Sequence, residues 1–432
     1  MPNHVENGYL VPKAYAWYVY SLIFMLMIFD YIDRQVVASL FPFLKQEWSL
    51  SDVQCGMLVA ALNWSITIFA FPVGLLADRW SRKKTVGLMS TLWSLGTLAC
   101  ALPHSYYQLF ATRFLVGAGE AGYAPVGCAL ISALFPQRLR SRLIGVFMGA
   151  GTLGSAIGVA LGGWIAVHWG WRHAFGIVGI PGLIFAIMFF FIRDYKTVEL
   201  TISASQAKGS AIRRNMSARD IMANLFGRPS VLALYLVSVT GFFFLGAIAA
   251  WLPTYFIRVA DLPVAEASLK TGLSVVVCIF GNYLVGHIAD RVVHRGLING
   301  YPLMAAASQL CSGLLYGVAF GLAQGQAQFY LLILAGVFLT AFVSPAYSAL
   351  SELVHPGLRS SVISVNVLLL NAFGFSTGPI VAGALSDRYG IEMTMIALSV
   401  VPFISMMISI VAAGLYNRDL AKVEKVDLQI ES

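Results

Sequence analysis

The segment "GLLADRWSRKK", residues 74–84, decides the fold because a weaker copy of it occurs in the other half of the chain. The copy reads "GHIADRVVHRG" and occupies residues 286–296. Each segment follows an apolar run, places an Ala-Asp-Arg triplet where that run ends, and continues into basic residues. This recurrence predicts that the chain is built from two similar halves.

The composition identifies the apolar runs as membrane spans. Of the 432 residues 58% are hydrophobic and only 11% are charged, with a mean hydropathy of +0.77. A soluble protein is about half apolar and about a quarter charged. The runs are long enough to cross a bilayer core of about 30 Å, and they lack the alternation of a β-barrel. The expected class is an all-α membrane protein with twelve spans, at 15–39, 52–77, 86–102, 107–131, 140–166, 172–192, 230–256, 268–290, 302–321, 327–350, 358–384 and 392–415.

Further matches support two six-helix repeats. "PQRLRSR" at 136–142 matches "PGLRSS" at 356–361, in the same order as the first pair. Three glycines also recur at a nearly constant separation: Gly158, Gly163 and Gly170 match Gly378, Gly383 and Gly390. Parallel repeats of this kind imply a pseudo-two-fold axis along the membrane normal, with a ligand site between the halves.

The basic residues indicate the topology and the division into domains. If both termini are cytoplasmic, most of the 28 lysines and arginines fall on the inner side, and the outer loops keep only Lys45, Arg172, Arg258, Lys270 and Arg388. We therefore expect a multi-pass protein of a bacterial-type inner (plasma) membrane, and no nucleic-acid partner. The polar stretch at 193–229 is predicted to be a cytoplasmic linker, with "SARDIMANLF" as a short surface helix, between six-helix bundles at 1–192 and 230–432.

The repeated loop resembles the signature of the major facilitator superfamily, the "G-x-L-A-D-R-x-x-R-K-K" that follows its second span. That family consists of transporters with two six-helix bundles. Asp78, at the end of a span, can accept hydrogen bonds from a helix N-terminus or an arginine and so hold the cytoplasmic side closed. We assign a cytoplasmic gate to five positions in the two copies: Gly74, Asp78, Arg79, Asp290 and Arg291.

Charged residues inside the spans are the candidates for function. Asp30, Asp33 and Arg34 lie in the first span, and Arg113 and Glu120 in the fourth. Each uncompensated charge in hydrocarbon costs several kcal/mol, so such residues mark functional sites by default. With a rise of about 1.5 Å per residue, Asp33 and Arg113 reach equivalent depths in antiparallel helices. Glu120 is predicted on the same face as Arg113, near the midplane.

These depths suggest a coupling mechanism. Arg113 is expected to hold Asp33, while Arg34 and Glu120 face each other across a cavity at a greater separation. Protonation of Glu120 would free Arg34, whose guanidinium suits a carboxylate or phosphate. The alternative is a buried structural ion-pair network that does not turn over.

The two charged segments also resemble particular groups of the superfamily. "YIDRQVV" with "RFLVGAGEAGYAP" is similar to the anion:cation symporters, which carry sugar acids and other organic anions with protons, and to the Spinster group, which moves lysolipids or sphingolipid phosphates. The resemblance implies proton binding at Asp33 and Glu120, and contacts to substrate and carboxylates at Arg34 and Arg113.

The second half is expected to complete the substrate site with Tyr235, Tyr347 and Asn371. The chain shows no nucleophile, metal-ligand or phosphate-loop motif, so we expect neither an enzyme, nor a metal, nor a cofactor. The prediction is a monomeric secondary transporter in contact with membrane lipids. It carries a small-molecule organic anion, a carboxylate or sugar acid, together with protons, by alternating access. A Spinster-type lysolipid or sphingolipid-like exporter is the alternative.

Overall fold

A computed structural model describes residues 11–79, 82–121, 123–192, 218–355 and 358–423, and within these ranges the chain is helical with no strand. Continuous apolar runs favour helices in a membrane because a helix satisfies its backbone hydrogen bonds internally. The first half forms α1 (Lys13–Trp48), α2 (Asp52–Arg79), α3 (Arg82–Ala99), α4 (Tyr106–Glu120), α5 (Tyr123–Leu134), α6 (Gln137–Trp169) and α7 (Trp171–Phe190).

The rest of the chain forms α8 to α17. Their bounds are α8 (Ala218–Phe226), α9 (Pro229–Arg258), α10 (Val264–Val276), α11 (Cys278–His294), α12 (Gly300–Gly321), α13 (Gly325–Leu339), α14 (Val343–Glu352), α15 (Arg359–Leu369), the π-helix η2 (Leu370–Phe375), α16 (Thr377–Leu398) and α17 (Val401–Leu420). The predicted surface helix is α8, and the remainder of the predicted linker, 193–217, lies outside the described residues.

Each of the twelve expected spans corresponds to one helix or to consecutive helices. The fourth is interrupted after Glu120, the eighth at Val277, the tenth between Leu339 and Val343, the eleventh by η2, and the twelfth between Leu398 and Val401. By length and composition, nine stretches of the described residues can cross a membrane. One of them, Arg359–Leu420, contains two expected spans because the backbone bends inside α16 at Gly390, where φ is 79°. The all-α membrane fold is thereby confirmed.

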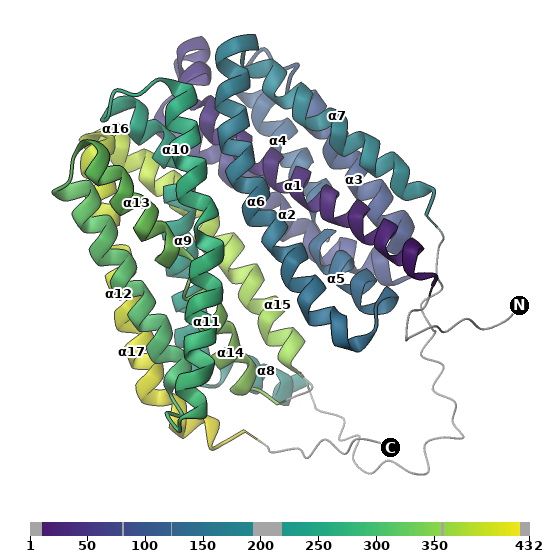
Figure 1. The fold of residues 1–432 in the computed structure, drawn as a ribbon, viewed down its shortest axis with the longest axis vertical. Helices are drawn as coiled ribbons and strands as arrows, with labels where there is room; N and C mark the ends of the chain where they lie inside the picture. Colours follow the sequence, from purple (N-terminus) through teal and green to yellow (C-terminus); the bar gives the residue numbers. More distant parts are fainter. Residues whose placement is uncertain (1–10, 80–81, 122, 193–217, 356–357, 424–432) are drawn as a thin grey trace, which may run out of the picture.

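The helices form two groups that lie side by side (Figure 1). In the first group α1 packs on α6 and α7, and α2 packs on α4; in the second, α9 packs on α16 and α17, and α12 on α13. The groups touch through α6 with α10, α2 with α16, and α1 with α9. They meet at the end where α1 finishes and α2 begins, the joined end. They diverge toward the terminal end, where α1 begins and α17 finishes (Figure 1).

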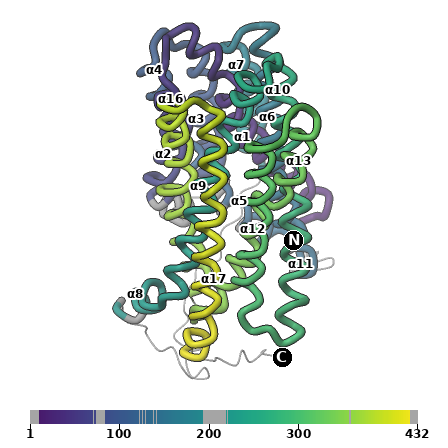
Figure 2. The backbone as a smooth tube through the Cα atoms, turned by 90° about the vertical axis from the view of Figure 1, so that its left-hand side faces the viewer, coloured from purple at the N-terminus to yellow at the C-terminus, as the bar shows by residue number. Residues whose placement is uncertain are grey.

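Helix α8 lies at the terminal end, beside the start of α9 and outside the main bundle (Figure 2). Its Leu225 is buried in an apolar cluster with Leu234 of α9, whereas Met222 is exposed. This arrangement matches an amphipathic helix on a membrane surface.

Two glycines allow the close approach of the groups at the joined end. A Cβ on Gly163 of α6 would lie 2.0 Å from Ser268 Oγ of α10, and a Cβ on Gly383 of α16 would lie 2.5 Å from the Asp52 carbonyl oxygen of α2. Gly163 and Gly383 are matched positions of the sequence repeat. The two contacts between the groups are therefore equivalent under the repeat, and each requires a small residue.

Candidate functional site

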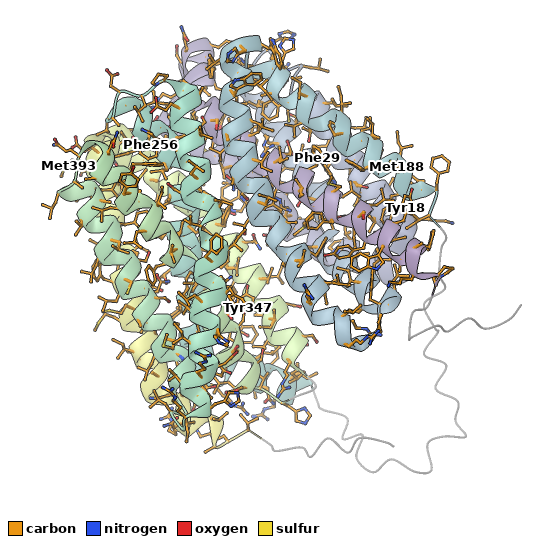
Figure 3. The ribbon with its side chains drawn as sticks, viewed as in Figure 1. Tyr18, Phe29, Met188, Phe256, Tyr347 and Met393 are labelled. Carbon is orange, nitrogen blue, oxygen red and sulfur yellow. The ribbon has the colours of Figure 1, made fainter. Side chains whose placement is uncertain are left out.

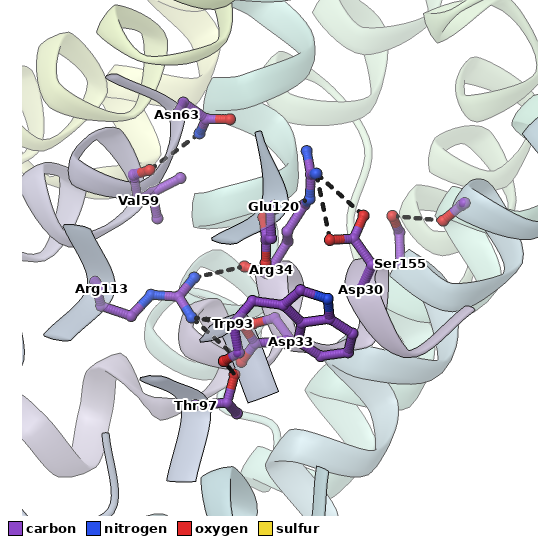
Figure 4. Close-up of polar contacts among 11 residues, drawn as sticks. Asp30, Asp33, Arg34, Val59, Asn63, Trp93, Thr97, Arg113, Glu120 and Ser155 are labelled. Atoms are coloured by element: carbon purple, nitrogen blue, oxygen red, sulfur yellow. Dashed lines mark hydrogen bonds and ion pairs between the residues drawn. The ribbon is translucent and has the colours of Figure 1, made fainter. Parts of the chain in front are cut away.

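Five charged residues of α1 and α4 converge in the first helix group, and we call them the charged cluster (Figure 4). Asp30 lies one turn before the adjacent residues Asp33 and Arg34 on α1, and Arg113 and Glu120 lie seven positions apart on one face of α4. Asp30, Asp33, Arg113 and Glu120 are 0–2% exposed. Such burial requires that the charges compensate one another.

The predicted contact between Asp33 and Arg113 is present. Arg113 Nη1 lies 3.4 Å from both carboxylate oxygens of Asp33 and 3.3 Å from the Asp33 carbonyl oxygen. Arg113 Nη2 donates to the Arg34 carbonyl oxygen at 3.4 Å, and the Thr97 hydroxyl of α3 lies within hydrogen-bonding reach of the Asp33 carboxylate. Arg113 thus fastens α4 to both the side chain and the backbone of α1.

The expected separation of Arg34 and Glu120 is wrong, because the two side chains are in direct contact. Arg34 Nε lies 3.0 Å from Glu120 Oε2. Glu120 is the last residue of α4, so its side chain points past the helix end toward α1. The rise per residue placed both groups at a similar depth, but it contained no information on the spacing between the two helix axes at this level.

Arg34 also holds a second carboxylate, Asp30, which the sequence interpretation left without a partner. Arg34 Nη2 lies 3.0 Å from Asp30 Oδ2 and donates to Oδ1 at 3.4 Å (Figure 4). The signal was present in the sequence, because residues four apart on a helix are neighbours and an acid followed by a base is the favourable order.

The cluster contains one more acid than base. Three carboxyl groups surround two guanidinium groups within contact distance. Asp30 and Asp33 accept hydrogen bonds from the arginines, whereas neither carboxylate oxygen of Glu120 accepts one from the described residues, despite the short approach of Arg34. A fully buried carboxyl group with so few donors is the member of the cluster that burial most favours in its neutral form.

Arg34 is the member that can be reached from outside the cluster. Its side chain is 19% exposed, and its guanidinium lies 4.7 Å from the centre of the Tyr31 ring. Tyr31 is near enough to Tyr347 of α14, in the second group, for the two hydroxyl groups to interact electrostatically. Figure 3 places Tyr347 in the second group, in the half of that group toward the first. Arg34 therefore points toward the interface between the groups.

Tyr347 and Asn371, two of the site residues predicted in the second half, lie on different helices of that half. Tyr347 lies within electrostatic range of Tyr31, as described, and near the fully buried Asn366 of α15. Asn371 is in η2, and its amide donates to the Val367 carbonyl oxygen of the preceding turn at 2.9 Å. A π-helical turn inside an α-helix is frequent at functional sites, and its position could not be read from the sequence.

Tyr235, predicted to bind substrate, lies away from the charged cluster. It is 3% exposed and lies in an apolar cluster with Leu350 and Leu353 of α14. The centre of its ring lies 6.0 Å from the centre of the Phe226 ring of α8. It is six residues from the start of α9, about 9 Å from the terminal end. Arg34 lies far deeper along α1.

The predicted gate is described only in part. The backbone at Gly74, Asp78 and Arg79 belongs to the last turns of α2, and the side chains of these residues lie outside the described ones. In the second copy, Asp290 accepts a hydrogen bond from the Tyr301 hydroxyl of α12 at 3.0 Å, within its own helix group, and Arg291 is exposed.

An ionic contact that the sequence did not suggest joins the groups at the joined end. The carboxylate of Asp52, the first residue of α2, is buried and accepts two hydrogen bonds from Arg258 at the end of α9, at 2.8 and 2.9 Å. The Ser386 hydroxyl of α16 donates to it at 2.6 Å, and Lys45 of α1 contacts it as well. Asp52 therefore joins α9 and α16 of the second group to α2 of the first group.

A second carboxylate caps α2 from across the interface. Asp387 of α16 accepts the backbone N–H of Asp52 at 2.8 Å and that of Val53 at 3.0 Å. The first N–H groups of a helix have no partner inside it, and a carboxylate at that position is favourable. We call Asp52, Arg258, Ser386 and Asp387 the joined-end latch.

Known proteins resemble this chain over most of its length. It is 26% identical over 384 residues to the hexuronate transporter of Bacillus subtilis (strain 168), covering 86% of this chain and 88% of that protein. It is 25% identical over 387 residues to protein spinster homolog 1 of Xenopus laevis, covering 85% and 72%. Among solved structures, a bacterial homolog of the human lysosomal transporter Spinster, in an inward-facing and unoccupied conformation, superimposes with a TM-score of 0.82 at 21% identity, covering 95% of this chain and 99% of the other.

The family follows from the fold, the repeat and a match to a family model. The model of the Major Facilitator Superfamily matches residues 23–379, which include both copies of the signature loop and the whole charged cluster. The fold of that family accounts for the two packed helix groups and for the twelve-span count. The chain is a multi-pass membrane transporter, not an enzyme, and it belongs to the Major Facilitator Superfamily.

Proposed function

We propose that this protein carries an organic anion, a carboxylate or sugar acid, together with protons. The observation that supports the proposal is Arg34, a partly accessible guanidinium held by two buried carboxyl groups in a cluster with one acid in excess. A guanidinium binds a planar carboxylate through two parallel hydrogen bonds. The similarity to a hexuronate transporter and to the gallate transporter of Pseudomonas putida agrees with an acidic substrate.

The Glu120 carboxylate and the substrate anion compete for Arg34 in this scheme, so proton binding to Glu120 favours anion binding. When a proton neutralises Glu120, the attraction that holds Glu120 against Arg34 Nε is lost. The guanidinium is then available to the carboxylate of the substrate. Asp33 and Arg113 keep α1 and α4 aligned during the exchange, and Tyr347 and Asn371 contribute to the pocket from the second group. In the absence of either the proton or the anion, the other binds weakly, and this dependence couples their transport.

The distribution of basic residues indicates how the protein is oriented in the membrane. We place both termini in the cytoplasm of a bacterial-type cell, so the joined end faces outward. Alternating access then consists of rocking of residues 1–192 against residues 230–432 around the charged cluster, with the joined-end latch closed in the conformation described here.

A Spinster-type exporter of a lysolipid or a sphingolipid-like molecule is the second candidate. Identity to protein spinster homolog 1 is almost as high as identity to the hexuronate transporter, and a guanidinium also binds a phosphate. In that case Arg34 would hold the headgroup.

Uptake into proteoliposomes under an imposed pH gradient tests the proposal. Radiolabelled D-glucuronate, gallate and sphingosine-1-phosphate are compared, with and without a protonophore. We expect saturable accumulation of an acid that collapses with the protonophore. Accumulation of the lipid alone would favour the second candidate, and accumulation of every acid regardless of the gradient would contradict proton coupling.

The joined-end latch gives a separate prediction. Arg258→Ala removes the bidentate partner of Asp52 and should shift the equilibrium away from the described conformation by about 1 kcal/mol, roughly a fivefold change in populations. Spin-label distances across α2 and α16 measure the shift. The matched control is Arg172→Ala at the same end, because Arg172 binds Glu47 bidentately within one helix group. Equal distance distributions in the wild type and Arg258→Ala would refute the latch.

A further inference from the structure

We propose that Asp30 shares a proton with Glu120 across Arg34, so that the charged cluster holds one resident proton before substrate arrives. Asp30 is then a positioning residue for proton coupling. The inference rests on the proposed function for its meaning in transport, although the resident proton itself requires no substrate.

The first argument is the balance of charge. Asp30, Asp33 and Glu120 surround Arg34 and Arg113, all at ion-pair distance, and four of the five are at most 2% exposed. A net negative charge at such a place would be uncompensated and costly. One proton on one of the three carboxyl groups removes the excess.

The second argument is geometric and selects the pair that holds the proton. Asp33 is committed to Arg113, which reaches both of its carboxylate oxygens and the backbone beside it. Asp30 and Glu120 are left to share the single guanidinium of Arg34, at 3.0 Å each. Because Arg34 contacts both of these carboxyl groups, a proton on either one removes the same excess of negative charge beside Arg34. Two carboxyl groups on one site titrate as a pair and retain one proton.

The described residues around Asp30 include no other base that could take this role. The titratable groups that face it are Tyr31, Asp33 and Arg34 on α1, Glu120 on α4, and Tyr123 on α5. The Tyr123 hydroxyl already donates to the Ile23 carbonyl oxygen, and the nearby Ser155 hydroxyl of α6 donates to the Gly151 carbonyl oxygen (Figure 4). Among the described residues only Arg34 and Glu120 remain to bind the Asp30 carboxyl group.

The stoichiometry of transport follows. A monoanion at Arg34 adds one negative charge to a neutral cluster, and one further proton from solvent, bound to a carboxylate oxygen of the Asp30–Glu120 pair, restores neutrality. One proton is therefore taken up for each monoanion, and the resident proton is not transported. With a neutral side chain in place of Asp30, the cluster would hold no resident proton. Glu120 alone would then have to bind the transported proton.

The test is Asp30→Asn, which keeps the shape of the side chain and removes its charge. Infrared spectra of the purified, substrate-free protein report protonated buried carboxyl groups through their carbonyl stretch. At neutral pH we expect this band in the wild type and in Asp30→Glu, and its loss in Asp30→Asn, although Glu120 is still present. Asp261→Asn, an exposed aspartate between α9 and α10, is the matched control and should keep the band.

A band that persists in Asp30→Asn, or that is missing from the wild type, would overturn the proposal. Thermal unfolding of each variant shows whether it is folded. In proteoliposomes that accumulate D-glucuronate, Asp30→Asn should also move the pH of half-maximal uptake to more acidic values by about one unit, a tenfold loss in proton affinity. Failure of glucuronate uptake in the wild type would count against the proposed substrate and would leave the infrared result standing.

Discussion

Glu120→Gln is expected to abolish the accumulation of an organic anion driven by a pH gradient, while leaving exchange of internal for external anion partly intact. Glutamine has nearly the same shape as a protonated glutamate, so Arg34 is permanently released for substrate. The variant cannot bind or release a proton at this position. Because the amide leaves Arg34 Nε free whether or not Asp30 holds a proton, the proton gradient no longer controls anion binding. Exchange needs only the loaded carrier to reorient, and this step does not require deprotonation.

Two measurements on Glu120→Gln separate these effects. Net uptake of labelled D-glucuronate under an inward proton gradient should fall to the level of protein-free liposomes. Counterflow with unlabelled glucuronate inside should persist and should lose its pH dependence. Glu392→Gln, an exposed glutamate in the turn of α16, is the control and should behave as wild type. Counterflow with an unaltered pH profile in Glu120→Gln would remove Glu120 from the coupling mechanism.

Arg34→Ala should eliminate anion binding, which is the second large effect. Truncating one member of a desolvated, hydrogen-bonded charge pair costs about 2–5 kcal/mol, so affinity for glucuronate should fall by roughly thirtyfold to several thousandfold. The loss includes more than the missing contact, since Asp30 and Glu120 would no longer have a cation between them. Ligand-dependent thermal stabilisation of the purified protein measures the change.

Arg34→Lys distinguishes the shape of the guanidinium from its charge. Lysine preserves the positive charge of the cluster but cannot form two parallel hydrogen bonds to a carboxylate. We expect Arg34→Lys to be as stable as the wild type and to bind glucuronate with intermediate affinity. Arg172→Ala, which removes an arginine remote from the cluster, is the control. Wild-type affinity in Arg34→Ala would exclude Arg34 from the substrate site.

The helical bundle could be predicted because its determinants are local. Apolar runs give the spans, the repeated loop gives the two halves, and the rise per residue gives the pairing of Asp33 with Arg113. The same calculation places Tyr235, only six residues from the start of α9, nearer the terminal end than Arg34. The four-residue spacing of Asp30 and Arg34 likewise predicts their contact.

The remaining features depend on distances that no local pattern contains. The contact between Arg34 and Glu120 depends on how closely α1 and α4 pack and on where α4 ends. The joined-end latch brings together Asp52, Arg258 and Asp387, from three helices that are remote in sequence. The π-helical turn that contains Asn371 packs against α9 and α2, which are remote from it in sequence.

The two repeat-equivalent contacts at the joined end differ in chemistry, and this difference affects how the protein opens. At Gly163 the neighbour is the small, uncharged Ser268. At Gly383 the neighbour is Asp52, whose carboxylate forms ion pairs with Arg258 and Lys45. Dissolved ions weaken attraction between charges and leave the fit of small side chains nearly unchanged. Concentrated electrolyte at the joined end would therefore loosen the α2–α16 edge before the α6–α10 edge. The carrier would begin to part asymmetrically, from one side, despite its internal symmetry.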